Sequence, residues 1–125
     1  MAHSALYIED NASSIRLIQI LLRRRPDIEL RVARTGRDGV KSAVDEPPDL
    51  IILDNRLPDA RGSDVLRALS CEPACDGIPI VIMSGDADTQ VAMELLSSGA
   101  AEYIPKPFDI HHFMSVIDRY LPAQP

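Results

Sequence analysis

Short apolar runs alternate with helical periodicities five times along this chain, and this alternation constrains the fold more than any other feature. Strands are predicted over Ala5–Ile8, Leu30–Ala33, Leu50–Leu53, Ile80–Met83 and Glu102–Ile104. Helices are predicted from about Ser13 to Arg25, after the Thr35–Gly36 turn to about Asp45, over Ser63–Leu69, from near Asp88 to Gly99, and after Asp109. The third and fourth strands are continuously apolar, as expected where helices cover both faces of a sheet. This pattern predicts an α/β fold with a parallel sheet and right-handed crossovers.

Amphipathic stripes predict which helix faces are buried. The first helix carries Ile15, Ile18 and Leu22 on one stripe, with Leu17 and Leu21 beside it. The last helix carries Ile110, Phe113, Met114, Ile117 and Leu121 on its predicted buried face. Pro26 ends the first helix, and Arg23–Arg25 precede it at the negative end of the helix dipole. We interpret these arginines as a solvated helix end, with an interaction patch as the alternative.

The composition is that of a globular domain, and its charge limits the partners. The length of 125 residues fits a single domain, 1–125, in which we identify no output domain. The net charge of -6 argues against non-specific binding to nucleic acid or to an anionic membrane. No apolar run reaches membrane-spanning length and no signal segment is recognisable, so we expect a cytoplasmic protein. Cys71 and Cys75 lack zinc-site spacing with the histidines and are expected to be reduced thiols.

Polar and charged residues follow four of the five predicted strands. Glu9 and Asp10 follow the first strand, Asp54 the third, Ser84 the fourth and Lys106 the fifth. Because the carboxyl ends of parallel strands lie at one edge of a sheet, we expect these side chains to converge. Three carboxylates, a hydroxyl and an ammonium suit a pocket for a divalent cation and a phosphoryl group.

The carboxylates have two interpretations each. A hard cation would remove the repulsion between Glu9 and Asp10, since magnesium binds one or two carboxylates and keeps several waters. Alternatively, the pair is a solvated loop at a helix start. Burial of Asp54 at a strand end would raise its pKa unless a cation or a donor compensates. Such a carboxylate can attack phosphorus to form an acyl phosphate, or it can simply cap a turn.

Lys106 and Ser84 complete the predicted pocket. Lys106 lies between Pro105 and Pro107, which restrict the backbone on both sides of it. A lysine fixed at a strand end is well placed to hold a phosphoryl oxygen, although an exposed lysine in a turn is the simpler interpretation. Ser84 precedes Gly85, and its hydroxyl can donate to the same group or cap the following helix.

Taken together, these positions resemble the receiver domain of bacterial response regulators over essentially the whole chain. The matching elements are Glu9–Asp10–Asn11, Leu53–Asp54, Leu57–Pro58 with Gly62, Met83–Ser84, Gly99–Ala100, and Tyr103 through Lys106–Pro107–Phe108. The resemblance implies a doubly wound, flavodoxin-like α/β fold with a five-stranded parallel sheet of order 2-1-3-4-5, flanked by five helices.

The resemblance also implies an acidic metal site. Asp54 looks like the phospho-acceptor. Asp10 would bind Mg²⁺ directly, and Glu9 mainly through water. Asp54 and the backbone carbonyl of Arg56 would complete the protein ligands, and Mn²⁺ could replace Mg²⁺.

Four further positions receive roles from the same resemblance. Lys106 would pair with the phosphoryl group, and Ser84 would donate a hydrogen bond to it. Tyr103 would be the aromatic switch that turns inward when Ser84 moves. The Lys106–Pro107 peptide bond would be cis, which is tolerable because it precedes proline.

The implied function is a phosphorylatable signalling switch of a two-component or phosphorelay system. It would accept a phosphoryl group from the histidine of a histidine kinase or a histidine phosphotransfer protein, without being a turnover enzyme. The fourth helix, fifth strand and fifth helix would contact a second copy or a downstream protein. Glu9–Asp10–Asn11 is similar to the opening of receivers attached to hybrid sensor kinases, which favours a relay context.

The chain also departs from the usual pattern of the family. Arg61 stands where the family usually has aspartate, and Ser63 where it usually has an apolar residue. Arg56 and Asp86 each lie two residues after a predicted site residue. We interpret them as rim residues that form an ion pair over the phosphoryl site and slow attack by water.

Two other classes of function remain open from the sequence. A phosphatase of the haloacid dehalogenase type also uses an aspartate nucleophile, but it needs a second aspartate two residues later, where this chain has Arg56. A receiver-like interaction module that binds partners without phosphorylation is the other alternative.

Overall fold

The computed structural model describes residues 3–85 and 89–123 and contains one parallel sheet. Its strands are β1 (His3–Ile8), β2 (Ile28–Ala33), β3 (Leu50–Asp54), β4 (Ile80–Ser84) and β5 (Glu102–Pro105). They are arranged in the order β2-β1-β3-β4-β5, and every neighbouring pair is parallel. The predicted fold class and strand order are therefore confirmed.

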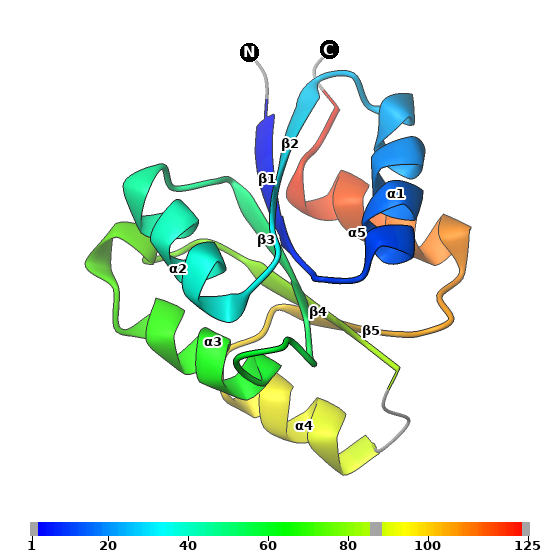
Figure 1. Cartoon of the computed structure of the whole chain (residues 1–125). Coiled ribbons are helices and arrows are strands. Elements are labelled where there is room, and N and C mark those ends of the chain that lie inside the picture. The colour runs from blue at the N-terminus through cyan, green and yellow to red at the C-terminus, as the bar shows by residue number, and fades with distance from the viewer. Residues whose placement is uncertain (1–2, 86–88, 124–125) are drawn as a thin grey trace.

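Helices connect the strands and cover both faces of the sheet (Figure 1). They are α1 (Ala12–Leu21), α2 (Gly36–Asp45), α3 (Gly62–Ser70), α4 (Thr89–Ser97) and α5 (Ile110–Tyr120). Helices α1 and α5 pack on one face, and α2, α3 and α4 pack on the other. The predicted start of the fourth helix near Asp88 lies outside the described residues.

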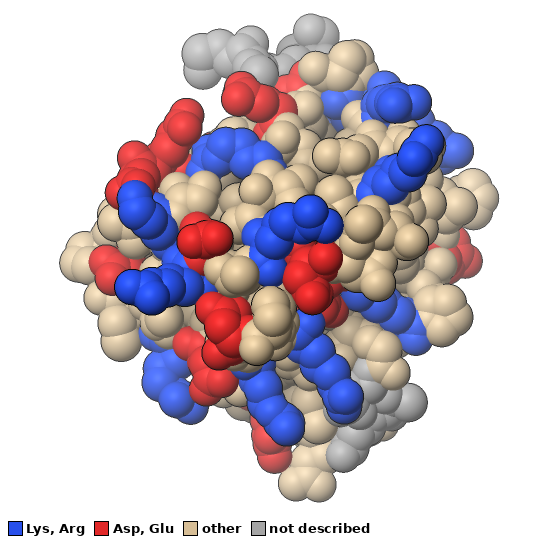
Figure 2. All heavy atoms as spheres, viewed as in Figure 1, with Lys and Arg blue, Asp and Glu red and all other residues tan. Residues whose placement is uncertain are grey.

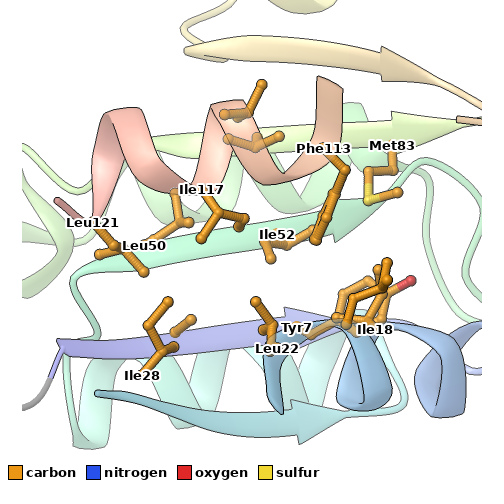
Figure 3. Packing of buried hydrophobic residues seen from close by; sticks show 14 of the residues in the cluster. Tyr7, Ile18, Leu22, Ile28, Leu50, Ile52, Met83, Phe113, Ile117 and Leu121 are labelled. Atoms are coloured by element: carbon orange, nitrogen blue, oxygen red, sulfur yellow. The ribbon is translucent and has the colours of Figure 1, made fainter. Parts of the chain in front are cut away.

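The alternation of side chains along the strands builds two apolar cores. In β1, Ala5 and Tyr7 belong to the core under α1 and α5, whereas Leu6 and Ile8 belong to the opposite core. Figure 3 shows the first of these cores, where Ile18 of α1 and Phe113 of α5 approach the central strands. All four β1 residues are fully buried, as the continuous apolar run predicts for a strand between two helical layers.

Local capping groups define where several helices begin and end. The side chains of Asn11, Thr35 and Asp109 accept hydrogen bonds from backbone N–H groups in the first turns of α1, α2 and α5. Gly99 follows α4 with a φ of 115°, the left-handed conformation that glycine adopts most readily. The predicted cap at Asp109 and the predicted helix stop at Gly99 are thus confirmed.

One predicted core position, Ile110, is wrong, and Leu17, beside the predicted stripe of the first helix, is exposed as well, because both lie at the margins of the apolar stripes. Leu17 of α1 and Ile110 of α5 are each 41% exposed. Leu17 is flanked on its helix by the buried Ile15, Ile18 and Leu21, which face the sheet in its place. Ile110 opens α5, one turn before the buried Phe113.

Arg25 is buried, so the prediction of a solvated arginine end is wrong for this residue. Its side chain is 10% exposed, and its guanidinium donates two hydrogen bonds to the carboxylate of Asp27, at 2.9 and 2.7 Å. It also donates to Asp118 Oδ1 at 2.7 Å and to the carbonyl of Leu121 at 2.6 Å. Arg25 therefore ties the start of β2 to the end of α5, while Arg23 and Arg24 remain exposed.

Helix α3 docks normally despite Arg61 and Ser63. Its apolar side is formed by Val65, Leu66 and Leu69, all buried in the core that contains β3 and β4. The side chain of Asp64 accepts a hydrogen bond from the backbone N–H of Arg61 at 3.0 Å, so the first turn of the helix is capped from within.

The surface carries both signs of charge. Figure 2 shows basic and acidic side chains interspersed over the visible face of the molecule. None of the helices in ranges 3–85 and 89–123 has the length and apolar character needed to span a bilayer. Both cysteines are free thiols, with Cys71 exposed and Cys75 buried.

Candidate functional site

The carboxyl ends of β1, β3, β4 and β5 surround a cavity of about 600 Å³. It is lined by Glu9, Asp10, Asn11, Ser14, Asp54, Arg56, Ser84, Gly85 and Lys106. Parallel strands bring their carboxyl ends to one edge, so residues separated by up to 97 positions meet here. The structure thus brings together the predicted site residues except Tyr103, and Asp86 lies outside the described residues.

Lys106 joins the two sides of the cavity. Its Nζ donates to Glu9 Oε1 at 2.9 Å and to Asp54 Oδ1 at 3.1 Å. The backbone N–H of Lys106 donates to the carbonyl of Ser84 at 2.7 Å, which continues the pairing of β5 with β4. The Lys106–Pro107 peptide bond is cis, as the family resemblance implies. The ammonium therefore lies between two buried carboxyl groups.

The charges in this cavity influence one another strongly. Burial, followed by the neighbouring Glu9 carboxyl, raises the pKa of Asp54 to about 6, although Lys106 acts in the opposite direction. Burial also opposes ionisation of Glu9, but interactions with Asp54 and Lys106 outweigh it and lower the pKa of Glu9. The pKa of Lys106 is raised, because the two carboxylates outweigh the cost of burying its ammonium. One carboxyl is thus held ionised, and the other is poised to lose its proton near neutral pH.

Glu9, Asp10 and Asp54 form an acidic cluster that could hold a cation. Each offers a carboxylate oxygen, and these oxygens all lie within 4.8 Å of one another. Glu9 and Asp54 are buried while Asp10 is exposed, so the cluster opens toward solvent on the side of Asp10. An oxygen-only donor set with an open side fits a hard divalent cation that retains water, as Mg²⁺ does.

The loop after β3 is held in place by contacts that the sequence alone did not reveal. The carboxylate of Asp59 accepts hydrogen bonds from the N–H groups of Gly36 and Arg37, at 2.8 and 3.0 Å, in the first turn of α2. These two bonds keep the pKa of Asp59 below its usual range. The N–H of Gly62 donates to the carbonyl of Asn55 at 2.8 Å, which closes the loop.

Two further residues support the acidic side of the cavity. Tyr7, predicted only as a strand residue, places its hydroxyl 3.3 Å from Glu9 Oε1. Burial and the nearby Glu9 charge raise the pKa of Tyr7, so this hydroxyl stays protonated and donates. Arg34 donates from its guanidinium to the carbonyl of Asp10 at 3.3 Å. The signal for Tyr7 in the sequence was its position two residues before Glu9 on the same strand face.

The predicted switch residues lie on adjacent strands. Ser84 is 2% exposed at the end of β4 and lines the cavity. Tyr103 of β5 is half-buried and packs against the core beneath α2, α3 and α4, opposite Ile82 in the strand register. Tyr103 is therefore next to the site but not part of the cavity wall.

A larger cavity of about 1020 Å³ lies between α3 and α4. Its wall includes Arg56, Arg61, Arg67 and Glu94, and no described group of metal-ligating residues is found in it. The chemistry-bearing residues identify the smaller, acidic cavity as the candidate site.

The strand order defines a doubly wound α/β fold with an acidic cavity at the carboxyl edge of its sheet. The sequence pattern of the response regulator receiver domain matches residues 5–118. The chain belongs to the response regulator receiver domain family. Receiver domains are phosphorylatable switches of two-component signalling, and the chain is such a domain.

Known proteins agree with this assignment. The chain is 40% identical over 100 residues to the regulatory protein LuxO of Vibrio cholerae, a match that covers 80% of this chain and 21% of LuxO. Its structure is similar to the signal receiver domain of a signal transduction histidine kinase from Syntrophus aciditrophicus. That comparison has a TM-score of 0.86 and 27% identity, covering 96% of this chain and 90% of the other.

A third relative is known with a metal in its site. The receiver domain of the sensor histidine kinase PA1611 from Pseudomonas aeruginosa has a magnesium ion coordinated in its active site cleft. The TM-score is 0.85 at 24% identity, covering 96% of this chain and 98% of that one. The chain spans between 21% and 47% of the length of the first curated relatives.

Proposed function

We propose that Asp54 is the residue that accepts the phosphoryl group. The proposal rests on one contact above all, the 3.1 Å bond from Lys106 Nζ to Asp54 Oδ1 in a cavity that also holds Glu9 and Asp10. This carboxylate ends the buried strand β3, so its backbone is fixed while an oxygen faces the cavity. Its pKa of about 6 leaves it mostly ionised at neutral pH, as a nucleophile must be.

The transfer step needs little from the protein beyond position and charge. An oxygen of Asp54 forms a bond to phosphorus while the bond from phosphorus to the donor histidine nitrogen breaks. The nitrogen leaves with the bonding electron pair as an imidazole. The ammonium of Lys106 lies within reach of Asp54 and offsets the charge on the transferred group.

The acidic cluster is proposed as the Mg²⁺ site. Asp10 and Asp54 would bind the cation directly, Glu9 mainly through water, and the backbone carbonyl of Arg56 would complete the protein ligands; Mn²⁺ could take the same place. When bound, the cation neutralises charge on the phosphoryl oxygens. The carboxylate spacing within 4.8 Å and the magnesium of the Pseudomonas aeruginosa relative support this assignment.

Ser84 and Tyr103 are proposed as the moving parts of the switch. The hydroxyl of Ser84 would donate to the new phosphoryl group and draw the end of β4 toward it. Tyr103 is half-buried on the neighbouring strand and would turn inward in response. The readout surface would be α4, β5 and α5, where Met93 and Leu96 are exposed apolar side chains on α4.

The biological context follows from this switch. The donor would be a histidine kinase or a histidine phosphotransfer protein, and the output a second copy of the chain or a downstream protein. We place the whole chain, 1–125, in one receiver domain that acts in the cytoplasm. It is proposed to be a switch that accepts the phosphoryl group on its own aspartate and can lose it again by hydrolysis, without being a turnover enzyme.

Arg56 is proposed as a rim residue that slows this loss. It lines the cavity two residues after Asp54, and its proposed partner Asp86 lies outside the described residues. The variant Arg56→Ala should lose its phosphoryl group faster than the wild-type protein. An equal or slower loss would remove this role.

A single experiment separates the proposed switch from its two rivals. The protein is incubated with acetyl phosphate, with Mg²⁺ or with EDTA, and its intact mass is followed over time. We expect one labile phosphoryl adduct that requires Mg²⁺ and disappears in Asp54→Ala. Continuous release of phosphate without an adduct would indicate a phosphatase. Absence of both, also with a histidine kinase, would indicate an interaction module.

A further inference from the structure

Tyr7 is a buried polar residue beside the site to which the proposed reaction assigns no role. It lies on β1 two residues before Glu9, and successive side chains of a strand alternate between faces. Its ring is packed in the core with Ile18 and Phe113, and in Figure 3 it lies toward the carboxyl end of the strands. Only its hydroxyl leaves the apolar environment, to reach Glu9.

The hydroxyl of Tyr7 and the ammonium of Lys106 bind the same atom. Tyr7 donates to Glu9 Oε1 at 3.3 Å, and Lys106 Nζ donates to it at 2.9 Å. Glu9 is 1% exposed, so solvent contributes little to holding its charge. Oε1 is thus held by two donors, one on β1 and one directly after β5.

The two donors differ in what else they must do. Lys106 also contacts Asp54, and in the proposed function it moves to the phosphoryl oxygen once Asp54 is modified. A buried carboxylate that loses its hydrogen-bond donor destabilises the folded protein, because no other group then compensates for the hydration that it lost on folding. Among the described residues Tyr7 donates to Glu9 alone, so it can keep Glu9 partnered in both states.

We propose that Tyr7 is a positioning residue of the acidic site. Its hydroxyl holds Glu9 Oε1, orients the Glu9 carboxylate toward the bound cation, and keeps it hydrogen-bonded when Lys106 engages the phosphoryl group. The inference rests on the proposed function for the part played by Lys106. The contact between Tyr7 and Glu9 is independent of it.

The direct test compares Tyr7→Phe with Tyr120→Phe. Both variants remove one hydroxyl and keep the ring. Tyr120 donates to the carbonyl of Ala101, and neither residue lines the acidic cavity. By isothermal titration calorimetry, Tyr7→Phe should bind Mg²⁺ about tenfold more weakly, as loss of an outer-shell partner does at other metal sites. Tyr120→Phe should bind as the wild-type protein does. Wild-type affinity in Tyr7→Phe would overturn the proposal.

A second measurement requires neither metal nor phosphoryl donor. In EDTA, Tyr7→Phe should lower the urea midpoint of unfolding in the wild-type background, and this shift should disappear in the Glu9→Met background. An equal shift in both backgrounds would mean that the hydroxyl of Tyr7 acts elsewhere, which overturns the proposal. Failure of the wild-type protein to accept a phosphoryl group would refute the proposed function but not this contact, so the two failures are distinguishable.

Discussion

Replacing Asp54 with asparagine should stabilise the metal-free protein at neutral pH. The pKa of Asp54 is about 6 in the folded protein, against an ordinary value of 3.8, so folding disfavours its ionised form. A carboxyl of this kind contributes stability that is fully present below 3.8 and is lost as the pH rises through about 6. Asparagine keeps an oxygen that can accept from Lys106 and carries no charge, so it avoids this loss.

The size of the effect follows from the same two values. A shift from 3.8 to about 6 corresponds to roughly 3 kcal/mol of unfolding free energy at pH 7.5. At pH 5 the advantage of Asp54→Asn should be smaller by about half, because Asp54 is then mostly protonated in the folded protein and its ionised form is little populated there. The lowered pKa of Glu9 makes stability fall as the pH decreases. This happens only below about pH 4.5, the ordinary pKa of Glu9, and so outside the range of the assay.

The assay is urea unfolding in EDTA at pH 5 and pH 7.5, followed by circular dichroism. Asp76→Asn, on an exposed residue, serves as the charge-matched control and should change stability little at either pH. Added Mg²⁺ should stabilise the wild-type protein and narrow the gap to Asp54→Asn. The electrostatic reasoning is refuted if Asp54→Asn is no more stable than the wild-type protein at pH 7.5, or if its advantage is unchanged at pH 5.

Three shorter predictions concern the framework and the cation. Arg25→Met should lower the unfolding free energy by about 2 kcal/mol, because it removes several charge-assisted hydrogen bonds, whereas the exposed Arg24→Met should change it little. Gly62→Ala should cost about 1–3 kcal/mol and slow phosphorylation, since its Cβ would lie 2.7 Å from Asn55 Oδ1 and 3.1 Å from Asn55 Cα; an unchanged urea midpoint would contradict this. Calorimetric affinity for Mg²⁺ should increase between pH 5 and 7.5 as Asp54 loses its proton, and a flat profile would exclude direct binding by this carboxyl.

The fold and the membership of the site were predictable from the sequence for one physical reason. A parallel sheet places every strand's carboxyl end at the same edge, so identifying the strands also identifies which residues meet. Asp54, Ser84 and Lys106 are located in this way without any knowledge of the loops. The cis peptide bond after Lys106 was predicted only through the resemblance to the family.

The side-chain contacts that stabilise the site were not predictable by periodicity. Arg25 reaches Asp118, which is 93 positions away. No local pattern in the sequence indicates that the segment before β2 meets the end of α5. Asp59 follows a proline in a loop, where it looks like an ordinary turn residue, yet it caps α2 from a distance of more than 20 positions. Such contacts depend on the packed positions of whole elements.

The burial of apolar residues at the margins of a helix stripe could not be predicted from the sequence either. An apolar residue next to a buried stripe can face either the sheet or solvent, depending on how the helix is rotated on the core. Leu17 and Ile110 are exposed for this reason. Tyr7 illustrates the opposite case, since its aromatic ring predicts a core position, whereas only its place two residues before Glu9 indicates that its hydroxyl reaches the carboxylate.

The central claim, that Asp54 accepts the phosphoryl group, is tested most directly by chemical trapping. The protein is phosphorylated with acetyl phosphate and Mg²⁺, reduced with borohydride, digested and mapped by mass spectrometry. Borohydride reduces an aspartyl phosphate to homoserine, so the modified position can be read from the peptide masses. The account predicts homoserine at position 54 and at no other aspartate. Homoserine at Asp10 or elsewhere, with position 54 unchanged, would contradict it.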